Sequence, residues 1–98
     1  MFERVLKKIR DRVRAGKFVV TLHAVEELED ENSSVLDAEY VILTGSITER
    51  QKDAETGEWK YLVRGHSLSS DELVVVTKLS RTNKLVIITV YGDEERNI

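Results

Sequence analysis

Hydrophobic residues recur at helical spacing over the first part of the chain. They lie on one side of a 3.6-residue repeat, the pattern of an amphipathic helix. The repeat closes at Ala15-Gly16, and glycine commonly follows the last turn of a helix. We therefore expect a helix over residues 3–15. Its apolar positions are Phe2, Val5, Leu6, Ile9 and Val13.

A short β-type run, Lys17 to Thr21, leads directly into a second helix. The run is rich in aromatic and β-branched residues, which favours a strand. Thr21 is a suitable N-cap for the helix, which we expect to continue to the break at residues 32–34. The buried stripe of this helix is expected at Leu22, Val25 and Leu28.

A third helix is expected from Val35 to Thr44. Ser34, with Asp37 three residues later, approximates a capping box, and Gly45 supplies a stop. The residues expected to be buried are Leu36, Tyr40, Val41 and Leu43.

From Ser46 onward the pattern changes to a period of two, which is typical of strands. We expect strands over residues 46–52, 58–66, 72–80 and 85–91. The last two are nearly continuous apolar runs, which belong in the middle of a sheet. The turn between them contains Asn83, which can adopt a positive φ.

The register of the last two strands decides which side chains face the core. With a two- or four-residue turn, Val76 lies opposite Thr89 and Lys78 opposite Ile87, whereas a three-residue turn shifts the register by one. The expected core face carries Leu73, Val75, Thr77, Leu79, Val86, Ile88 and Val90. The opposite face, where a functional site would lie, carries Val76, Lys78, Ser80, Thr89 and Tyr91.

These elements predict a single α+β domain over residues 1–98. N-terminal helices pack on a mainly antiparallel sheet of four to five strands, and the polar tail from Gly92 is expected to fray. The chain contains no cysteine, which excludes disulfides and cysteine-ligated zinc. No apolar run approaches the ~18 residues of a membrane span, so we expect a cytoplasmic protein without a membrane segment.

Charge is divided between the helices. The chain has 15 basic and 18 acidic residues and a net charge of −3, which mildly disfavours nucleic acid. The first helix is rich in lysine and arginine, whereas the second is rich in glutamate and aspartate. A basic patch would therefore be local.

One candidate for acid–base chemistry is His23, with Glu26 and Glu27 three and four residues later. A carboxylate at that spacing can hold the imidazole in one tautomer. The alternative, which is more common, is a histidine that packs the start of the helix against the sheet. The spacing lacks the second histidine of a zinc helix, so we expect no metal and no cofactor.

A second group of candidates lies on the late strands. Cations there would hold a phosphodiester, while a histidine or tyrosine moves protons. The alternative is that these cations only solvate the sheet edge. Trp59 and Tyr61 would stack on bases or, more commonly, belong to the core. The candidates in this group are Arg64, His66, Lys78, Arg81 and Tyr91.

Several segments of the chain resemble a known family pattern. They are His23-Ala24 at a helix start, Leu43-Thr-Gly-Ser-Ile-Thr-Glu49, Trp59-Lys-Tyr61 and the last apolar strand. Over residues 17–91 the chain is similar to the uncharacterised bacterial and archaeal domain-of-unknown-function family 4258. That family resembles, in topology, the RelE/ParE-type toxins, which include ribosome-dependent ribonucleases and gyrase poisons. The resemblance points to His23 and the cations Arg64, Lys78 and Arg81.

Two functions of different class follow. The first is a small toxin-like ribonuclease that acts on RNA without a metal, with an antitoxin as protein partner. The second is a non-catalytic domain that binds a protein or associates with itself as a homodimer, which the acidic net charge favours. The toxins are usually basic, and family members commonly carry an Arg-Met type pair where this chain has Glu27-Leu28.

Overall fold

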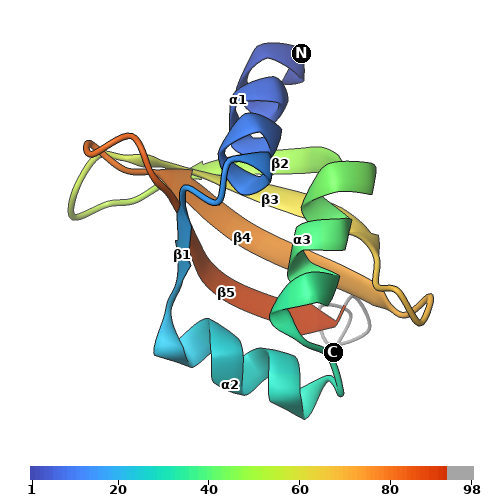
Figure 1. Ribbon diagram of the computed structural model, residues 1–98. Coiled ribbons are helices and arrows are strands. Elements are labelled where there is room, and N and C mark those ends of the chain that lie inside the picture. Colours follow the sequence, from blue (N-terminus) through green and yellow to red (C-terminus); the bar gives the residue numbers. More distant parts are fainter. Residues whose placement is uncertain (93–98) are drawn as a thin grey trace.

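The computed structural model describes residues 1–92 and contains three helices and five strands in this part of the chain (Figure 1). The helices are α1 (Glu3–Arg14), α2 (Leu22–Asp30) and α3 (Val35–Thr44). The strands are β1 (Phe18–Val20), β2 (Ser46–Lys52), β3 (Trp59–His66), β4 (Glu72–Leu79) and β5 (Leu85–Gly92). Every predicted element is present, and the prediction for the tail lies mostly outside the described residues.

The strands form one sheet in the order β1-β5-β4-β3-β2. Strands β2 to β5 form an antiparallel meander, and β1 adds to the outer edge of β5 in parallel. The α+β class and the mainly antiparallel sheet are therefore confirmed. No helix in residues 1–92 is long and apolar enough to cross a membrane.

The meander gives the sheet two different ends. Its turns alternate, so those at residues 53–58 and 80–84 lie at one end and the turn at 67–71 lies at the other. Strand β1 runs parallel to β5, so α1 finishes at the same end of the sheet as the turns at 53–58 and 80–84. Helix α2 then runs along β5 toward the end with the turn at 67–71 (Figure 1).

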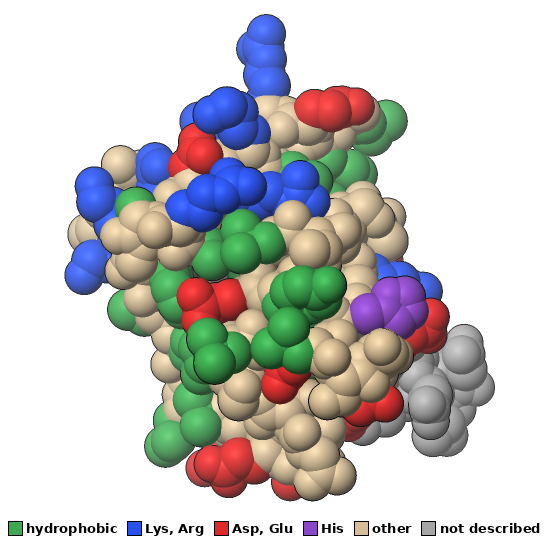
Figure 2. Space-filling model, turned by 45° about the vertical axis from the view of Figure 1, so that its right-hand side comes forward, with side chains coloured by type: hydrophobic (Ala, Val, Ile, Leu, Met, Phe, Trp, Pro, Cys, Tyr) green, Lys and Arg blue, Asp and Glu red, His purple; other side chains and the backbone are tan. Residues whose placement is uncertain are grey.

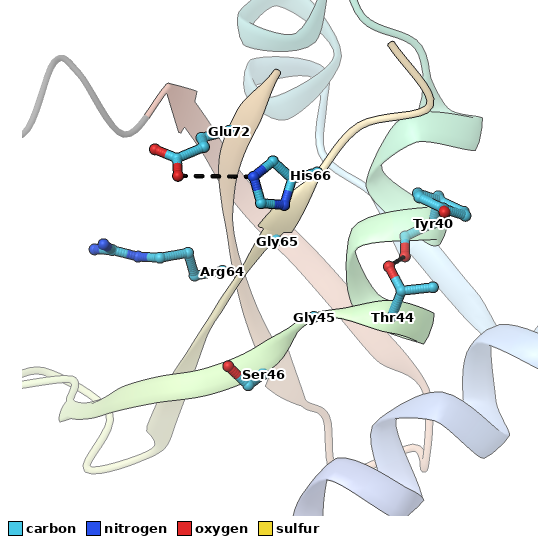
Figure 3. A pocket seen from close by; sticks show the side chains of 8 residues that line it. All are labelled: Tyr40, Thr44, Gly45, Ser46, Arg64, Gly65, His66 and Glu72. Atoms are coloured by element: carbon cyan, nitrogen blue, oxygen red, sulfur yellow. Dashed lines mark hydrogen bonds and ion pairs between the residues drawn. The ribbon is translucent and has the colours of Figure 1, made fainter. Parts of the chain in front are cut away.

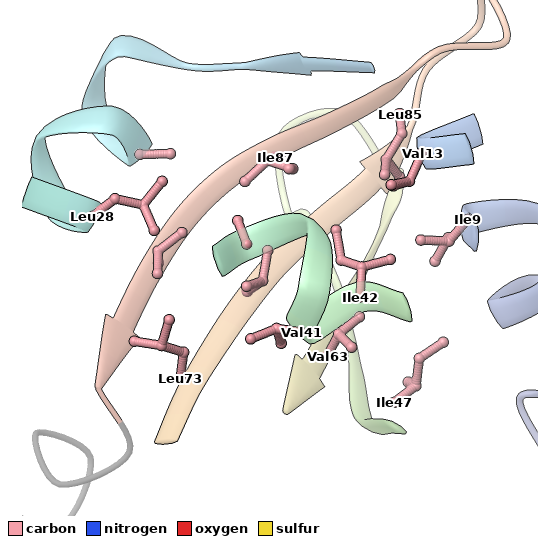
Figure 4. Packing of buried hydrophobic residues seen from close by; sticks show 14 residues of the cluster. Ile9, Val13, Leu28, Val41, Ile42, Ile47, Val63, Leu73, Leu85 and Ile87 are labelled. Atoms are coloured by element: carbon pink, nitrogen blue, oxygen red, sulfur yellow. The ribbon is translucent and has the colours of Figure 1, made fainter. Parts of the chain in front are cut away.

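The main core lies between the helices and one face of the sheet (Figure 4). All three helices contribute to it, with the strands supplying the other side. A smaller cluster on the second face draws only on strand residues in the described chain. Its members are Leu62, Val74 and Val76, with Ile88 and Tyr91 packed against them.

The predicted stripes of α2 and α3 are partly wrong. Helix α2 buries Ala24 and Leu28, while Leu22 is 74% exposed. Helix α3 turns Ala38 toward the sheet, so Leu36 and Tyr40 are exposed. Small residues allow a helix backbone to approach the sheet closely, and a search for large apolar residues overlooks them. The prediction was right for Leu28 and Val41 and partly right for Val25 and Leu43, which are half-buried.

The predicted face of β5 is also partly wrong. Val76 pairs with Thr89 as expected, but Thr77 pairs with Ile87, and Lys78 with Val86 rather than Ile87. A bulge at this point gives β5 one extra residue and changes the phase of its side chains. Leu85 and Ile87 therefore enter the main core together with Val90, whereas Val86 and Ile88 do not.

The predicted helix starts are confirmed. The Ala24 backbone N–H donates to Thr21 Oγ1 at 3.0 Å, and Ser34 forms a capping box with Asp37. Asn83 has the expected positive φ, 66°. These features are local in sequence, which is why the residue pattern was sufficient to find them.

The bulge makes a prediction about stability. Ile87→Ala should lower the free energy of unfolding by about 2–4 kcal/mol, because it removes a fully buried side chain. Val86→Ala, its neighbour on the second face, should cost about 1 kcal/mol or less. Urea denaturation of both variants measures the difference. Equal losses, or a larger loss for Val86→Ala, would refute the assigned register.

Candidate functional site

The Glu27 carboxylate is bound to the edge of β5. Glu27 Oε1 accepts hydrogen bonds from the Val90 backbone N–H at 3.0 Å and from Thr89 Oγ1 at 2.9 Å. Strand β1 pairs with β5 only as far as Ile87, so α2 and Glu27 cover the next stretch of its edge. A carboxylate in this place satisfies a backbone donor that would otherwise lack a strand partner.

His23 lies on the solvent side of that contact. Its Nε2 is 3.3 Å from Glu27 Oε1, and its side chain is 68% exposed. The imidazole is thus neither packed against the sheet, as the structural alternative supposed, nor enclosed in a pocket. Its carboxylate partner is already engaged in holding β5.

The five predicted catalytic residues lie in different parts of the fold. Lys78 Nζ is 3.2 Å from Glu58 Oε1, and Arg81 is exposed in the turn at residues 80–84. Arg64 and Tyr91 share one row of the sheet, each paired with Val74 on β4 between them. His23 is on α2, beside the outer edge of β5, which faces away from β4. The fold thus places Arg64 and Tyr91 in one row, and Lys78 close to the turn that holds Arg81, but it does not bring all five residues to one site.

A pocket of about 480 Å³ lies where α3 meets β2, at the ends of β3 and β4 (Figure 3). His66 Nε2 is 3.7 Å from Glu72 Oε1 across the strand pair. Arg64 lies on the other side of β3 from Tyr40 in Figure 3. The lining residues are Tyr40, Thr44, Gly45, Ser46, Arg64, Gly65, His66 and Glu72.

Two glycines allow close approach of the backbone beside the pocket. A Cβ at Gly45 would collide with the Arg64 carbonyl oxygen, and a Cβ at Gly65 would lie 3.1 Å from the Gly45 Cα. The end of α3 can therefore rest directly on β3. Asp37 links the start of α3 to the turn at 67–71, because its carboxylate accepts hydrogen bonds from Ser34 N at 2.8 Å and from Leu68 N at 2.9 Å.

The pocket combines an imidazole, a carboxylate and hydroxyl groups, while Arg64 lines it from β3 with its side chain directed away from Tyr40 and Thr44 (Figure 3). His66 and Glu72 are both more than half exposed, and their contact is a cross-strand pair beside a turn. The described residues contain no group of three histidine, cysteine or carboxylate side chains that could hold a metal ion. Sequence reasoning found His66 and Arg64 but missed Glu72, which the strand pairing over a five-residue turn would have indicated.

A second candidate surface is defined by its charge. In residues 1–92, every lysine and arginine except Arg64 lies on α1, just after it, or next to the turns at 53–58 and 80–84. We call this surface the basic end. Its cations are Arg4, Lys7, Lys8, Arg12, Arg14, Lys17, Arg50, Lys52, Lys60, Lys78, Arg81 and Lys84, whereas Arg10 of α1 donates instead to the Ile42 and Gly45 carbonyl oxygens at the end of α3.

Contacts connect the two parts of the basic end. Arg12 Nε donates to the Asn83 carbonyl oxygen at 2.9 Å, which brings α1 against the turn at 80–84. Arg4 and Lys8 precede Arg12 by eight and four residues, so all three share one stripe of the helix. That stripe therefore continues onto the turn at 80–84.

The carboxylates are concentrated elsewhere. Helix α2, the start of α3 and the turn at 67–71 form what we call the acidic end. Figure 2 shows the separation, with blue side chains gathered over α1 and red ones mainly toward the lower part of the view. The acidic end carries Glu26, Glu27, Glu29, Asp30, Glu31, Asp37, Glu39, Asp71 and Glu72.

Comparison with known protein families finds a match to one family model. The family model described as "Domain of unknown function (DUF4258)" matches residues 20–92, most of the chain. A search of the curated proteins found no match.

The contact between Glu27 and β5 predicts that mutations of Glu27 and of His23, one helical turn away, change stability by different amounts. Glu27→Ala should destabilise the protein by about 1–3 kcal/mol, because the Val90 N–H loses its acceptor. His23→Gln should change stability by less than about 0.5 kcal/mol, since the imidazole is exposed. Thermal denaturation measures both, with the exposed Glu26→Ala as the control. A destabilising His23→Gln would show that the histidine has a structural role.

A further prediction concerns acid. The Ser34 and Leu68 backbone N–H groups hold the pKa of Asp37 below its usual range, despite partial burial of the carboxyl. Asp37 therefore stabilises the fold fully above its unfolded pKa of about 3.9, and this contribution is lost as pH falls through the lowered folded value. Asp37→Asn should be less stable than wild type at neutral pH, and the difference should shrink below pH ~4. A difference that stays constant in chemical denaturation from neutral to strongly acidic pH would contradict this.

Proposed function

The chain belongs to the DUF4258 family, to which no activity is assigned, and we propose that it binds RNA through the basic end. The observation that carries this proposal is the separation of charge between the two ends of the sheet. RNA is also the substrate that the toxin resemblance implies.

The net charge of −3 is a poor guide to this surface. The molecule measures 31 × 29 × 28 Å along its principal axes. Charges in physiological salt are screened over about 8 Å, much less than that. A phosphate at the basic end therefore experiences mainly nearby cations, and the acidic end is screened. Locally positive surfaces of this kind bind polyanions through release of counterions.

Part of the positive charge is compensated locally. Lys60 Nζ lies 3.8 Å from Asp53 Oδ2, and Lys78 is paired with Glu58. On α1, Asp11 contacts both Lys7 and Arg14. The cations nevertheless outnumber the carboxylates of this surface, which are Glu3, Asp11, Glu49, Asp53, Glu55 and Glu58.

Cleavage of the bound RNA stays a prediction. Metal-independent cleavage needs a proton donor or acceptor within hydrogen-bond reach of the phosphodiester. Of the expected catalytic residues, Lys78 and Arg81 belong to the basic end, whereas His23 lies on α2. The charge distribution supports binding, and RNA length on a denaturing gel tests cleavage in the same samples.

A second candidate function is binding of a protein partner, such as an antitoxin or a second copy. Leu36 and Tyr40 lie four residues apart on α3 with exposed side chains, and the exposed Leu68 is tied to this helix through Asp37. Green side chains are visible over this region in Figure 2. Sedimentation over a range of concentrations tests self-association directly.

RNA binding should depend on the exposed cations. Replacing Arg4, Lys8 and Arg81 by glutamine should weaken RNA binding and lower the slope of log K against log salt by up to about 2, at roughly 0.7 per contact. The matched control replaces Glu26, Glu29 and Asp30 by their amides and should leave binding equal or slightly tighter. Fluorescence anisotropy with a labelled RNA measures both. Absence of wild-type binding at low salt, or an unchanged slope in the first variant, would refute the proposal.

A further inference from the structure

Trp59 is a large apolar side chain left partly in solvent. It is the single tryptophan of the chain, begins β3 and is 39% exposed. Tyr61 and Val63, on the same face of β3, both join the main core. The core therefore ends at Tyr61, which makes an edge-to-face ring contact with Phe2, centroids 6.4 Å apart.

Two cations from β2 accompany the exposed ring. The Arg50 guanidinium carbon is 4.2 Å from the Trp59 ring centroid, and Lys52 Nζ is 5.7 Å from it. Lys52 pairs directly with Trp59 across the strands, and Arg50 pairs with Tyr61. Both cations are exposed, and β2 is the outer strand of the sheet. The Arg50 guanidinium covers one face of the ring, and a ligand can reach the part of Trp59 that stays in solvent.

We propose that Trp59 is a stacking site for an unpaired base, with Arg50 and Lys52 contacting the adjacent phosphates; this deepens, and rests on, RNA binding by the basic end. Proteins that hold single strands combine aromatic rings for the bases with cations along the backbone. The site therefore selects single-stranded RNA over duplex, because bases inside a duplex are already stacked.

A purely structural explanation makes different predictions. Cation–π and cross-strand contacts at Trp59 stabilise the β2–β3 hairpin by about 0.5–1 kcal/mol without any ligand. On that explanation, replacing the ring changes the melting temperature and leaves RNA affinity unchanged. Stacking predicts a loss of affinity that exceeds any loss of stability.

Trp59 is its own probe, since no other tryptophan contributes to the fluorescence. An oligo(U) strand of about eight nucleotides, within the usual length of a single-strand site, should quench the emission and saturate at the Kd found by anisotropy. A duplex of equal length should quench little. Trp59→Leu should weaken binding of the strand roughly 5- to 100-fold, and Trp59→Phe should retain part of it.

The matched control is Tyr40→Leu, which replaces a ring of similar exposure, 40%, on α3. It should leave RNA affinity unchanged. The stacking site is overturned if Trp59→Leu binds the strand as tightly as wild type does, or if strand and duplex quench the emission equally. Either result leaves the proposed function standing. Absence of any RNA binding at low salt overturns both.

Discussion

The outer edge of β5 is the constraint on which the rest of the structure depends. Its first half pairs in parallel with β1, and its second half is held by α2 through the Glu27 carboxylate. A parallel neighbour fixes the direction in which the chain passes the sheet. The chain therefore enters β1 at the end of the sheet with the two hairpin turns and leaves it toward the other end, so the last turn of α1 and the start of α2 lie at opposite ends of β1.

As a result, the basic residues of α1 and the acidic residues of α2 come to lie on different parts of the surface. Basic residues of α1 join those beside the two hairpin turns, because the meander brings both turns to the same end of the sheet. Acidic residues of α2 join those of the turn at 67–71 at the other end. The result is a protein of negative net charge with a positive end, the feature on which the proposed RNA binding rests.

Local features of the fold could be predicted from sequence because they depend on neighbouring residues. The Thr21 cap, the Ser34–Asp37 capping box and the turn at Asn83 are examples. The class and the strand positions also followed from periodicity. The face of β5 could not, because its bulge is set by pairing with β4 rather than by its own pattern. Similarly, Ala24 and Ala38 mark the closest contacts of their helices, which apolar size conceals.

The candidate site was less predictable than the fold. Individual cations such as Lys78 and Arg81 were identified, but their neighbours depend on contacts between distant segments, for example Arg12 with Asn83. His23 stood out in sequence because of its carboxylate spacing, and the structure shows that Glu27 serves the edge of β5. From sequence, Trp59 could either stack on a base or, more commonly, belong to the core; the structure leaves it 39% exposed because the main core ends at Tyr61.

The most direct test of the central claim is a map of the RNA-contacting surface by amide chemical shifts. A short single-stranded RNA is added to isotopically labelled protein, and the shifts of the backbone amides are followed. The account predicts that the largest changes fall on α1, on residues adjoining the turns at 53–58 and 80–84, and at the indole N–H of Trp59. Changes concentrated on α2 and the turn at 67–71, with the basic end unaffected, would contradict it.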